Sequence, residues 1–345
     1  MKLITTQADL SHALRTIAPA VSTSNSHPIL NCCLIAADAG AMTITGFNLD
    51  LGITVTIPAA IDTAGTVALP YRLLAGLVGR MDDGEPVTLS DGSVSASSGS
   101  YTLAACDAAD YPALPVVEAP GAELHLTAGI RACMAAASTD ASKAILQGIH
   151  MANGVMESTD GHRLMRYAVD LPTGIDLVLP AATMKLLQDR VVTIAAARGQ
   201  AVIDAGDGIT IYSRILDGKY PDVAALIPSS FEHTITIDRH RFTRALERVA
   251  LIAEAHNSVV KLTAAKQLTL SAEADANNGK ETLAYDGTAK GTWAFNVHYL
   301  LDGLKAMRGH ESVTLHANGA ITPVVLRATD SMDMTYLVMP VQVRG

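Results

Sequence analysis

Aromatic side chains and long apolar runs are both scarce in this chain of 345 residues. Aromatic residues make up 4% of the sequence and hydrophobic residues 49%, so Ala, Val, Leu and Ile must build most of the core. No run approaches the roughly 18 uninterrupted apolar residues that span a bilayer, and the N-terminal stretch lacks the apolar centre of a signal peptide. We therefore expect a globular protein of the cytoplasm with no membrane partner.

Cysteine is also rare, and its spacing argues against two kinds of site. The four cysteines are Cys32, Cys33, Cys106 and Cys133, and they include no C-x-x-C pair. Neither a zinc site nor a disulfide framework is indicated, and buried free thiols are expected because Cys behaves as a small core residue. We expect no metal and no cofactor.

An excess of positive charge is missing as well. The formal net charge is -9, whereas a basic balance is the usual mark of a protein that binds phosphates over its whole surface. The sum does not exclude a protein that presents positive charge on one surface only. The positions of Lys and Arg therefore matter more than their number.

One pattern occurs three times along the chain, at intervals of about 110 to 120 residues. In each copy a short strand-like run leads into a helical pattern, at 69–74, 179–184 and 295–300. A second helical pattern precedes each of these, at 8–14, 128–134 and 240–246. The endings of the copies agree as well, at 110–115, 219–228 and 336–340. Chance explains one such match but hardly three sets in the same order. The repeats predict three similar domains, 1–117, 118–231 and 232–345.

Each copy is predicted to be internally doubled, with two helices over antiparallel sheet, which makes an α+β fold. In the first copy the helices are expected at 9–21, with Asp9 as its cap, and at 70–81, where Pro lies near the start. Alternating or continuous apolar residues predict the strands at 2–6, 29–37, 42–57, 66–69, 86–90 and 94–106.

The basic residues of the repeated helices fall opposite their apolar stripes. Arg241, Arg244 and Arg248 share one face of the helix near 240, whereas Phe242 and Leu246 lie on the other. A solvated helix face is the simplest explanation for any single helix. Repetition favours a shared surface that contacts a phosphate backbone without reading sequence. The residues expected to face DNA are Arg15, Arg72, Arg80, Arg131, Lys185, Arg190, Arg241, Arg244, Arg248, Lys305 and Arg308.

The stretch 158–167 concentrates polar residues and invites an enzyme hypothesis. A hydrolase would use Asp160 and His162, but no nucleophile motif or metal-binding motif accompanies them. Gly161 and Asp160 instead predict a turn at the end of a strand. Arg163 and Leu164 would then project from a fixed backbone, which suits peptide binding.

These residues and several motifs elsewhere resemble one family. The motifs are Thr-Asp-Gly-His-Arg-Leu at 159–164, Tyr-Pro-Asp at 220–222, Phe-Asn-Val-x-Tyr-x-Leu-Asp at 295–302 and Tyr-x-Val-Met-Pro at 336–340. In that order they resemble the bacterial DNA polymerase III beta subunit, the sliding clamp. The resemblance implies a non-catalytic, head-to-tail homodimeric ring around double-stranded DNA, with helices lining the hole. It also implies four kinds of protein partner: the replicative polymerase catalytic subunit, the clamp loader, repair polymerases and mismatch-repair proteins.

The resemblance further implies a pocket for partner peptides and a subunit contact. The pocket residues would be Leu146, Thr159, Gly161, His162, Arg163, Leu164, Pro221, Leu226, Asn296, Tyr299, Val338, Met339, Pro340 and Val341. The subunit contact would join Tyr101 and Leu103 of one chain to Leu251 and Ile252 of the other.

The chain departs from the family pattern at a few positions. Residues 22–26 and 98–100 lack the basic residues often found there, so weaker DNA contact by the first domain is expected. Ala225 replaces a commonly longer side chain, and the tail 341–345 differs, which suggests a changed peptide preference. An accessory clamp with altered partners is the alternative that these departures leave open.

Overall fold

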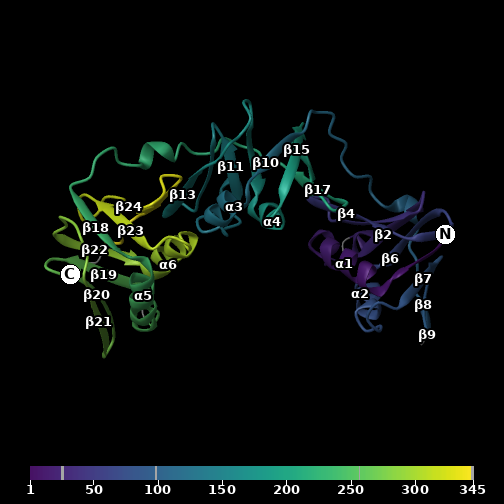
Figure 1. Cartoon of the computed structure of the whole chain (residues 1–345), viewed down its shortest axis with the longest axis horizontal. Helices are drawn as coiled ribbons and strands as arrows, with labels where there is room; N and C mark the ends of the chain where they lie inside the picture. The colour runs from purple at the N-terminus through teal and green to yellow at the C-terminus, as the bar shows by residue number, and fades with distance from the viewer. Residues whose placement is uncertain (25–26, 98, 256, 343–345) are drawn as a thin grey trace. The chain divides into compact units, whose positions relative to one another are not determined.

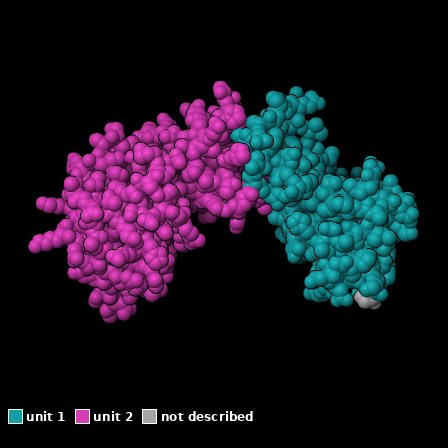
Figure 2. Space-filling view, viewed as in Figure 1, with its two compact units in different colours: residues 1–124, 190–215 teal, residues 125–189, 216–345 magenta. Residues whose placement is uncertain are grey.

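The computed structural model describes residues 1–24, 27–97, 99–255 and 257–342. Positions 25, 26, 98 and 343–345, which belong to the departures noted above, lie outside these ranges. The chain forms two compact units, residues 1–124 with 190–215 and residues 125–189 with 216–345 (Figure 2). Each unit is α+β, as predicted. The division into three domains remains a prediction.

Unit 1 contains a five-stranded and an eight-stranded sheet. The first has the order β5-β1-β7-β8-β9 and the second the order β10-β15-β16-β17-β4-β3-β2-β6. The helices are α1 (Gln7–Ile17) and α2 (Tyr71–Val78). The strands are β1 (Lys2–Thr6), β2 (Cys32–Asp38), β3 (Ala41–Phe47), β4 (Leu51–Pro58), β5 (Ala60–Thr63), β6 (Gly65–Pro70), β7 (Pro86–Ser90), β8 (Ser93–Ala96), β9 (Gly99–Thr102), β10 (Ala122–His125), β15 (Val191–Ala197), β16 (Gln200–Asp204) and β17 (Ile209–Arg214).

Unit 2 contains an eight-stranded and a four-stranded sheet. Their orders are β14-β11-β12-β13-β25-β24-β23-β18 and β21-β20-β19-β22. The helices are α3 (Thr127–Cys133), α4 (Ala181–Leu186), α5 (Arg239–Ala253) and α6 (Val297–Ala306). The strands are β11 (Gly148–Ala152), β12 (Val155–Thr159), β13 (Arg163–Ala168), β14 (Asp176–Pro180), β18 (His233–Asp238), β19 (Val259–Ala264), β20 (Leu268–Ala274), β21 (Asn277–Leu283), β22 (Gly291–Asn296), β23 (Ser312–Ala317), β24 (Val324–Ala328) and β25 (Met334–Val338).

The predicted repeat of a short strand followed by a helix is confirmed. In the described part of the chain each α-helix follows a strand at once or after one residue, in the pairs β1–α1, β6–α2, β10–α3, β14–α4, β18–α5 and β22–α6 (Figure 1). Neighbouring strands pair antiparallel in the described part of the chain, for example β17 with β4 and β13 with β25. These two pairings join strands from different copies of the repeat.

The sequence located the helix faces correctly. Leu10, Leu14 and Ile17 of α1 are buried, and so are Phe242 and Leu246 of α5. This burial follows from helical periodicity, which places residues three and four apart on the same side.

Several predicted boundaries were wrong, each for a local reason. The first helix begins at Gln7. Its N-cap is Thr6 and not Asp9, because the side chain of Thr6 accepts the backbone N–H of Asp9. The strand expected at 29–37 begins only at Cys32, since Pro28 opens a short 3-10 helix.

Two long predicted strands are each divided into two shorter ones. Asn48 ends the first part of 42–57, because its Oδ1 accepts the N–H groups of Asp50 and Leu51. Leu49 between them has φ of 77°. The strand expected at 94–106 is divided into β8 and β9, and the second ends at Thr102. The helix expected at 70–81 ends at Val78.

The four cysteines are free thiols, and Cys32, Cys33 and Cys133 are buried as predicted, whereas Cys106 is only half-buried. Burial raises the pKa of the Cys33 thiol to about 12. In the part of the chain that the structure describes, no cluster of His, Cys, Asp or Glu is suited to a metal ion. None of the described helices is long and apolar enough to cross a membrane.

The close approach of α6 to β25 supports a prediction about Gly303. A Cβ at Gly303 would overlap the ring of the fully buried Tyr336. We expect Gly303→Ala to destabilise unit 2 by about 1–3 kcal/mol, although Ala is the better helix former. Gly76→Ala on α2 is the matched control, because its Cβ would meet only Arg80 Nη1 at 3.6 Å. The control substitution should stabilise unit 1 by about 0.5–1 kcal/mol. Calorimetric melting of both variants measures the two shifts, and a higher melting temperature for Gly303→Ala would contradict this packing.

Candidate peptide socket and basic groove

The stretch 158–167 forms the end of β12, a tight turn and most of β13. Gly161 has φ of 95°, which favours glycine. Oδ1 of Asp160 accepts the N–H groups of His162 at 2.8 Å and Arg163 at 3.1 Å. Asp160 is therefore the turn residue that the sequence indicated.

Two further side chains fix this turn. Thr159 Oγ1 accepts the N–H of Gly161 at 3.0 Å and donates to the carbonyl of Arg163 at 2.7 Å. Lys143 Nζ donates to the carbonyl of Asp160 at 2.9 Å. No sequence pattern points to Lys143, which lies 17 positions before Asp160 and belongs to no motif.

The C-terminal strand lies directly beside the turn. β13 pairs with β25 so that Arg163 is opposite Val338 and Leu164 is opposite Leu337. The N–H of Met339 donates to the carbonyl of His162 at 2.8 Å. The tail then continues past β22, where the N–H of Val341 donates to the carbonyl of Ala294 at 2.7 Å. The turn and the tail, which the family resemblance placed together, do meet.

Helix α6 provides a third element at this place. Asn296 caps it by accepting the N–H of His298 at 2.9 Å. The ring of Tyr299 stacks on His162, with ring centroids 6.1 Å apart, and the Arg163 guanidinium lies 4.4 Å from its centroid. Tyr336 fixes the helix by donating to the carbonyl of Tyr299 at 2.7 Å.

The eight-stranded sheet of unit 2, which contains β13 and β25, has two different faces. α3 and α6 pack on the face from which Tyr336 points toward α6. The opposite face, called the outer face here, carries an apolar cluster. Side chains alternate along strands, so Leu164 and Leu337 point the other way. Residues 216–231, the covering segment, lie over them (Figure 1). The buried members are Leu164, Val178, Tyr220, Val223, Val325 and Leu337, with Ile145, Leu146, Leu216, Ile227 and Phe231 packed around them.

The fourteen predicted pocket residues, called the socket here, all belong to unit 2. Leu164 and Val338 are buried, whereas Leu226, Met339 and Val341 are exposed by 55%, 36% and 39%. Exposed apolar side chains beside a buried apolar cluster are typical of a surface that binds a partner. The sequence missed Val178, Val223 and Val325, although the alternation of their strands could have placed the first and the last.

Arg163 is the most constrained charged group of the site. Its Nε lies 3.0 Å from Asp160 Oδ2 and its Nη1 2.6 Å from Asp302 Oδ2. Burial alone would lower the pKa of the Arg163 guanidinium, but Tyr336, Asp302 and Asp160 together raise it. Arg163 therefore stays charged and holds the turn against α6.

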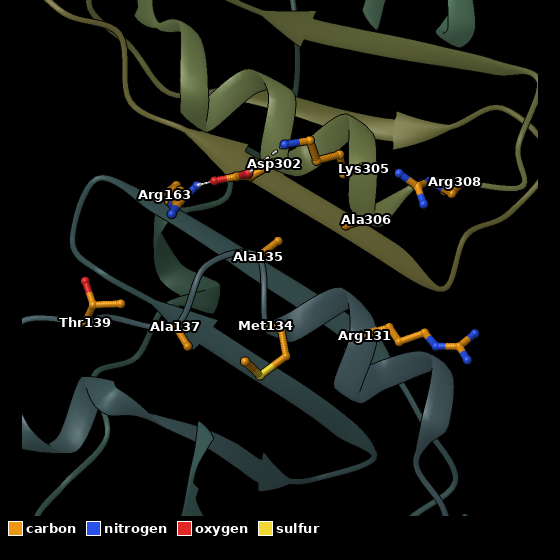
Figure 3. A pocket seen from close by; sticks show the side chains of 10 residues that line it. All are labelled: Arg131, Met134, Ala135, Ala137, Thr139, Arg163, Asp302, Lys305, Ala306 and Arg308. Atoms are coloured by element: carbon orange, nitrogen blue, oxygen red, sulfur yellow. Dashed lines mark hydrogen bonds and ion pairs between the residues drawn. The ribbon is translucent and has the colours of Figure 1, made fainter. Parts of the chain in front are cut away.

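A groove of about 600 Å³ lies between α3 and α6 (Figure 3). Three of the residues expected to face DNA line this basic groove: Arg131, Lys305 and Arg308. Arg163 and Asp302 lie at one end, where Asp302 Oδ1 is 3.8 Å from Lys305 Nζ. The other lining residues are Met134, Ala135, Ala137, Thr139 and Ala306.

The basic residues expected to face DNA differ in how far they are neutralised. Arg248 donates to both oxygens of Glu281, at 2.7 and 2.8 Å. Arg131 pairs with Asp189, Arg190 with Asp207, and Arg80 donates to the carbonyl of Gly76. No ion pair within the described ranges involves Arg15, Arg72, Lys185, Arg241, Arg244 or Arg308.

The four residues expected at a subunit contact lie at or near sheet edges. Tyr101 is 44% exposed on β9, an edge strand in unit 1, and Leu251 is 73% exposed on α5 in unit 2. Ile252 is half-buried against Gly279 of β21, which is also an edge strand. Leu103 is only 8% exposed. The chain folds back at this position, and the N–H of Leu103 donates to the carbonyl of Gly92.

The hydrolase hypothesis finds no catalytic pair at this turn. The carboxylate of Asp160 binds two backbone N–H groups and Arg163. The ring of His162 stacks on Tyr299. Between the described side chains of Asp160 and His162 there is no hydrogen bond, so no acid-base dyad is formed.

Comparisons with known proteins agree with this geometry. The model for the N-terminal domain of the DNA polymerase III beta subunit matches residues 1–115, and that for its C-terminal domain matches 224–342. The beta sliding clamp of Synechococcus elongatus is 33% identical over 378 residues and covers 100% of both chains. That of Synechocystis is 34% identical over 393 residues and covers 99% of both. The solved sliding clamp of Bacillus subtilis is 25% identical, with a TM-score of 0.92 and 100% of both chains covered.

The fold therefore defines a DNA clamp, a class of protein that works by encircling DNA and not by catalysis. Within that class the chain belongs to the bacterial DNA polymerase III beta subunits, the beta sliding clamps. Its function is that of a processivity factor in DNA replication, and the hydrolase alternative is wrong.

Proposed function

We propose that the socket binds short extended peptides of replication and repair proteins. The observation that supports this is that the turn at 159–163, the tail at 338–341 and α6 meet, while Met339 and Val341 of the tail and Leu226 of the covering segment stay exposed. The occupants would be segments of the replicative polymerase, the clamp loader, repair polymerases and mismatch-repair proteins. Each apolar anchor that becomes fully buried would contribute about 1.5–3 kcal/mol.

Leu226 offers a clean test of the socket. We expect Leu226→Asp to weaken binding of a fluorescent polymerase-derived peptide at least roughly tenfold, since a charge would replace an apolar contact. The fold should be unaffected, because Leu226 is 55% exposed. Met332→Asp is the matched control, at a residue 83% exposed between β24 and β25. Equal peptide affinity for Leu226→Asp and the parent would overturn the assignment.

The basic helix faces are proposed to contact the backbone of double-stranded DNA. The eleven predicted residues lie on or beside the helices, and all except the half-buried Arg190 are exposed. Such contacts carry no sequence information, which suits a protein that slides. The setting is the cell interior, where chromosomal DNA is replicated. Because basic residues are missing at 22–26 and 98–100, we still expect the first 117 residues to contact DNA more weakly.

Two arginines of α5 should contribute unequally to DNA binding. Arg244 has no ion-pair partner among the residues described, whereas Arg248 is bound by both oxygens of Glu281. We expect Arg244→Ala to reduce the log-log salt dependence of duplex binding by about 0.9, the value for one phosphate. Arg248→Ala should change it by less than half as much. Fluorescence anisotropy at increasing salt measures both, and an unchanged slope for Arg244→Ala would count against this contact.

We also propose a head-to-tail homodimeric ring of two three-domain chains. The supporting observation is that each unit presents an open sheet edge beside an exposed apolar side chain, β9 with Tyr101 and β21 with Leu251 nearby. Unpaired edge strands readily pair with another chain. Leu103 would act from within its own unit, because it is buried there.

Leu251 tests the subunit contact. We expect Leu251→Asp to lower the native mass from two chains to one, because a charge at the centre of an apolar contact is costly. Leu226→Asp, which lies in the socket, should remain a dimer. Native mass spectrometry distinguishes the two, and a dimer of unchanged stability for Leu251→Asp would refute this contact.

A further inference from the structure

The outer face of the sheet in unit 2 carries a row of charged residues beside the apolar cluster. The register places His150 of β11 opposite Glu157 of β12, and Glu157 opposite Arg166 of β13. Asp176 of β14 pairs with Ala152, two residues along from His150. Four neighbouring strands thus contribute one side chain each to a single row.

His150 is held at both ring nitrogens by carboxylates. Its Nδ1 lies 2.9 Å from Glu157 Oε1 and its Nε2 lies 3.0 Å from Asp176 Oδ1. A neutral imidazole has one N–H, so only the protonated ring donates to both oxygens. Glu157 is 7% exposed, and its second oxygen accepts from Arg166 Nε at 3.2 Å.

The same ring supports the covering segment. His150 stacks on Tyr220, with ring centroids 4.8 Å apart and planes at 25°. Tyr220 is buried in the apolar cluster, which also contains Leu164 and Leu337. It immediately precedes Pro221, a socket residue, and lies six positions before Leu226 on the same segment. A movement of the His150 ring would therefore shift the segment that carries Tyr220, Pro221 and Leu226, which forms one side of the socket.

We propose that protonated His150 is a positioning residue for the socket, which it supports by holding the ring of Tyr220, and with it the covering segment, against the sheet. The inference rests on the proposed peptide binding. When the imidazole loses its proton, one nitrogen presents a lone pair to a carboxylate oxygen, and that contact becomes repulsive. The ring then turns or withdraws, and Tyr220 loses its support.

The direction of the pH effect follows from the groups that face His150. Burial lowers the pKa of His150, but Glu157 and Asp176 outweigh it and raise the pKa above its ordinary value. Arg166 lies beyond Glu157 and neutralises part of its charge. A raised pKa means that the stabilising contribution is complete below the ordinary pKa of about 6.5 and is lost as pH rises through the folded value. Peptide binding should therefore weaken toward alkaline pH.

The experiment measures peptide affinity by fluorescence anisotropy from about pH 6 to about pH 9, with a labelled polymerase-derived peptide as probe. In the parent the Kd should rise roughly fivefold across this range. His150→Gln should bind weakly throughout, with no change across the range. Asp176→Asn, at a carboxylate whose side chain is 80% exposed, should move the midpoint to lower pH. His162→Gln, in the socket wall, should keep the pH dependence of the parent.

The outcomes separate the two proposals. No peptide binding by the parent at any pH would overturn the socket itself and this inference with it. A Kd that does not change with pH, or the same profile in His150→Gln as in the parent, would overturn only the role of His150. If His150→Gln does not fold, NMR titration of the His150 ring in the parent decides. A midpoint at or below about pH 6.5 would exclude a ring held protonated by two carboxylates.

Discussion

The antiparallel pairing of β13 with β25 is the interaction on which the rest of unit 2 depends. It joins residues more than 150 positions apart in the chain and places Arg163 opposite Val338. Because side chains alternate along strands, this one register sends Tyr336 toward α6 and Leu337 toward the outer face. A shift of one residue would exchange these faces, leaving Gly303 without its partner and the apolar cluster without Leu337.

Part of this arrangement was predictable from the sequence, and the part that was not depended on long-range contacts. Helical spacing located the buried faces of α1 and α5, and Gly161 with Asp160 located the turn. Local side chains then changed the boundaries: Thr6 replaced Asp9 as a cap, and Asn48 divided a strand.

The functional residues show the same division. The fourteen socket residues were named from a family resemblance, because no periodicity brings 159–164, 296–299 and 338–341 together. Lys143 was not predicted, because it acts through a hydrogen bond to a backbone carbonyl. The charge of Arg248 was predicted, but not its neutralisation by Glu281, since Glu281 is on a strand 33 positions away. Sequence patterns thus gave the faces of elements, whereas pairing between elements required the structure.

Arg163 shows how the two proposed ligands are kept apart. It lines the basic groove and also supports the socket through Tyr299, yet Asp160 and Asp302 already satisfy its guanidinium. In the proposed DNA contact, phosphate would be attracted mainly by Arg308, because Arg131 is paired with Asp189 and Lys305 lies 3.8 Å from a carboxylate oxygen of Asp302. Exposed charges of this kind bind weakly and are screened by salt. Weak contact is what a sliding protein needs, since a ring is retained on DNA by its closure and a strong local contact would only slow its movement.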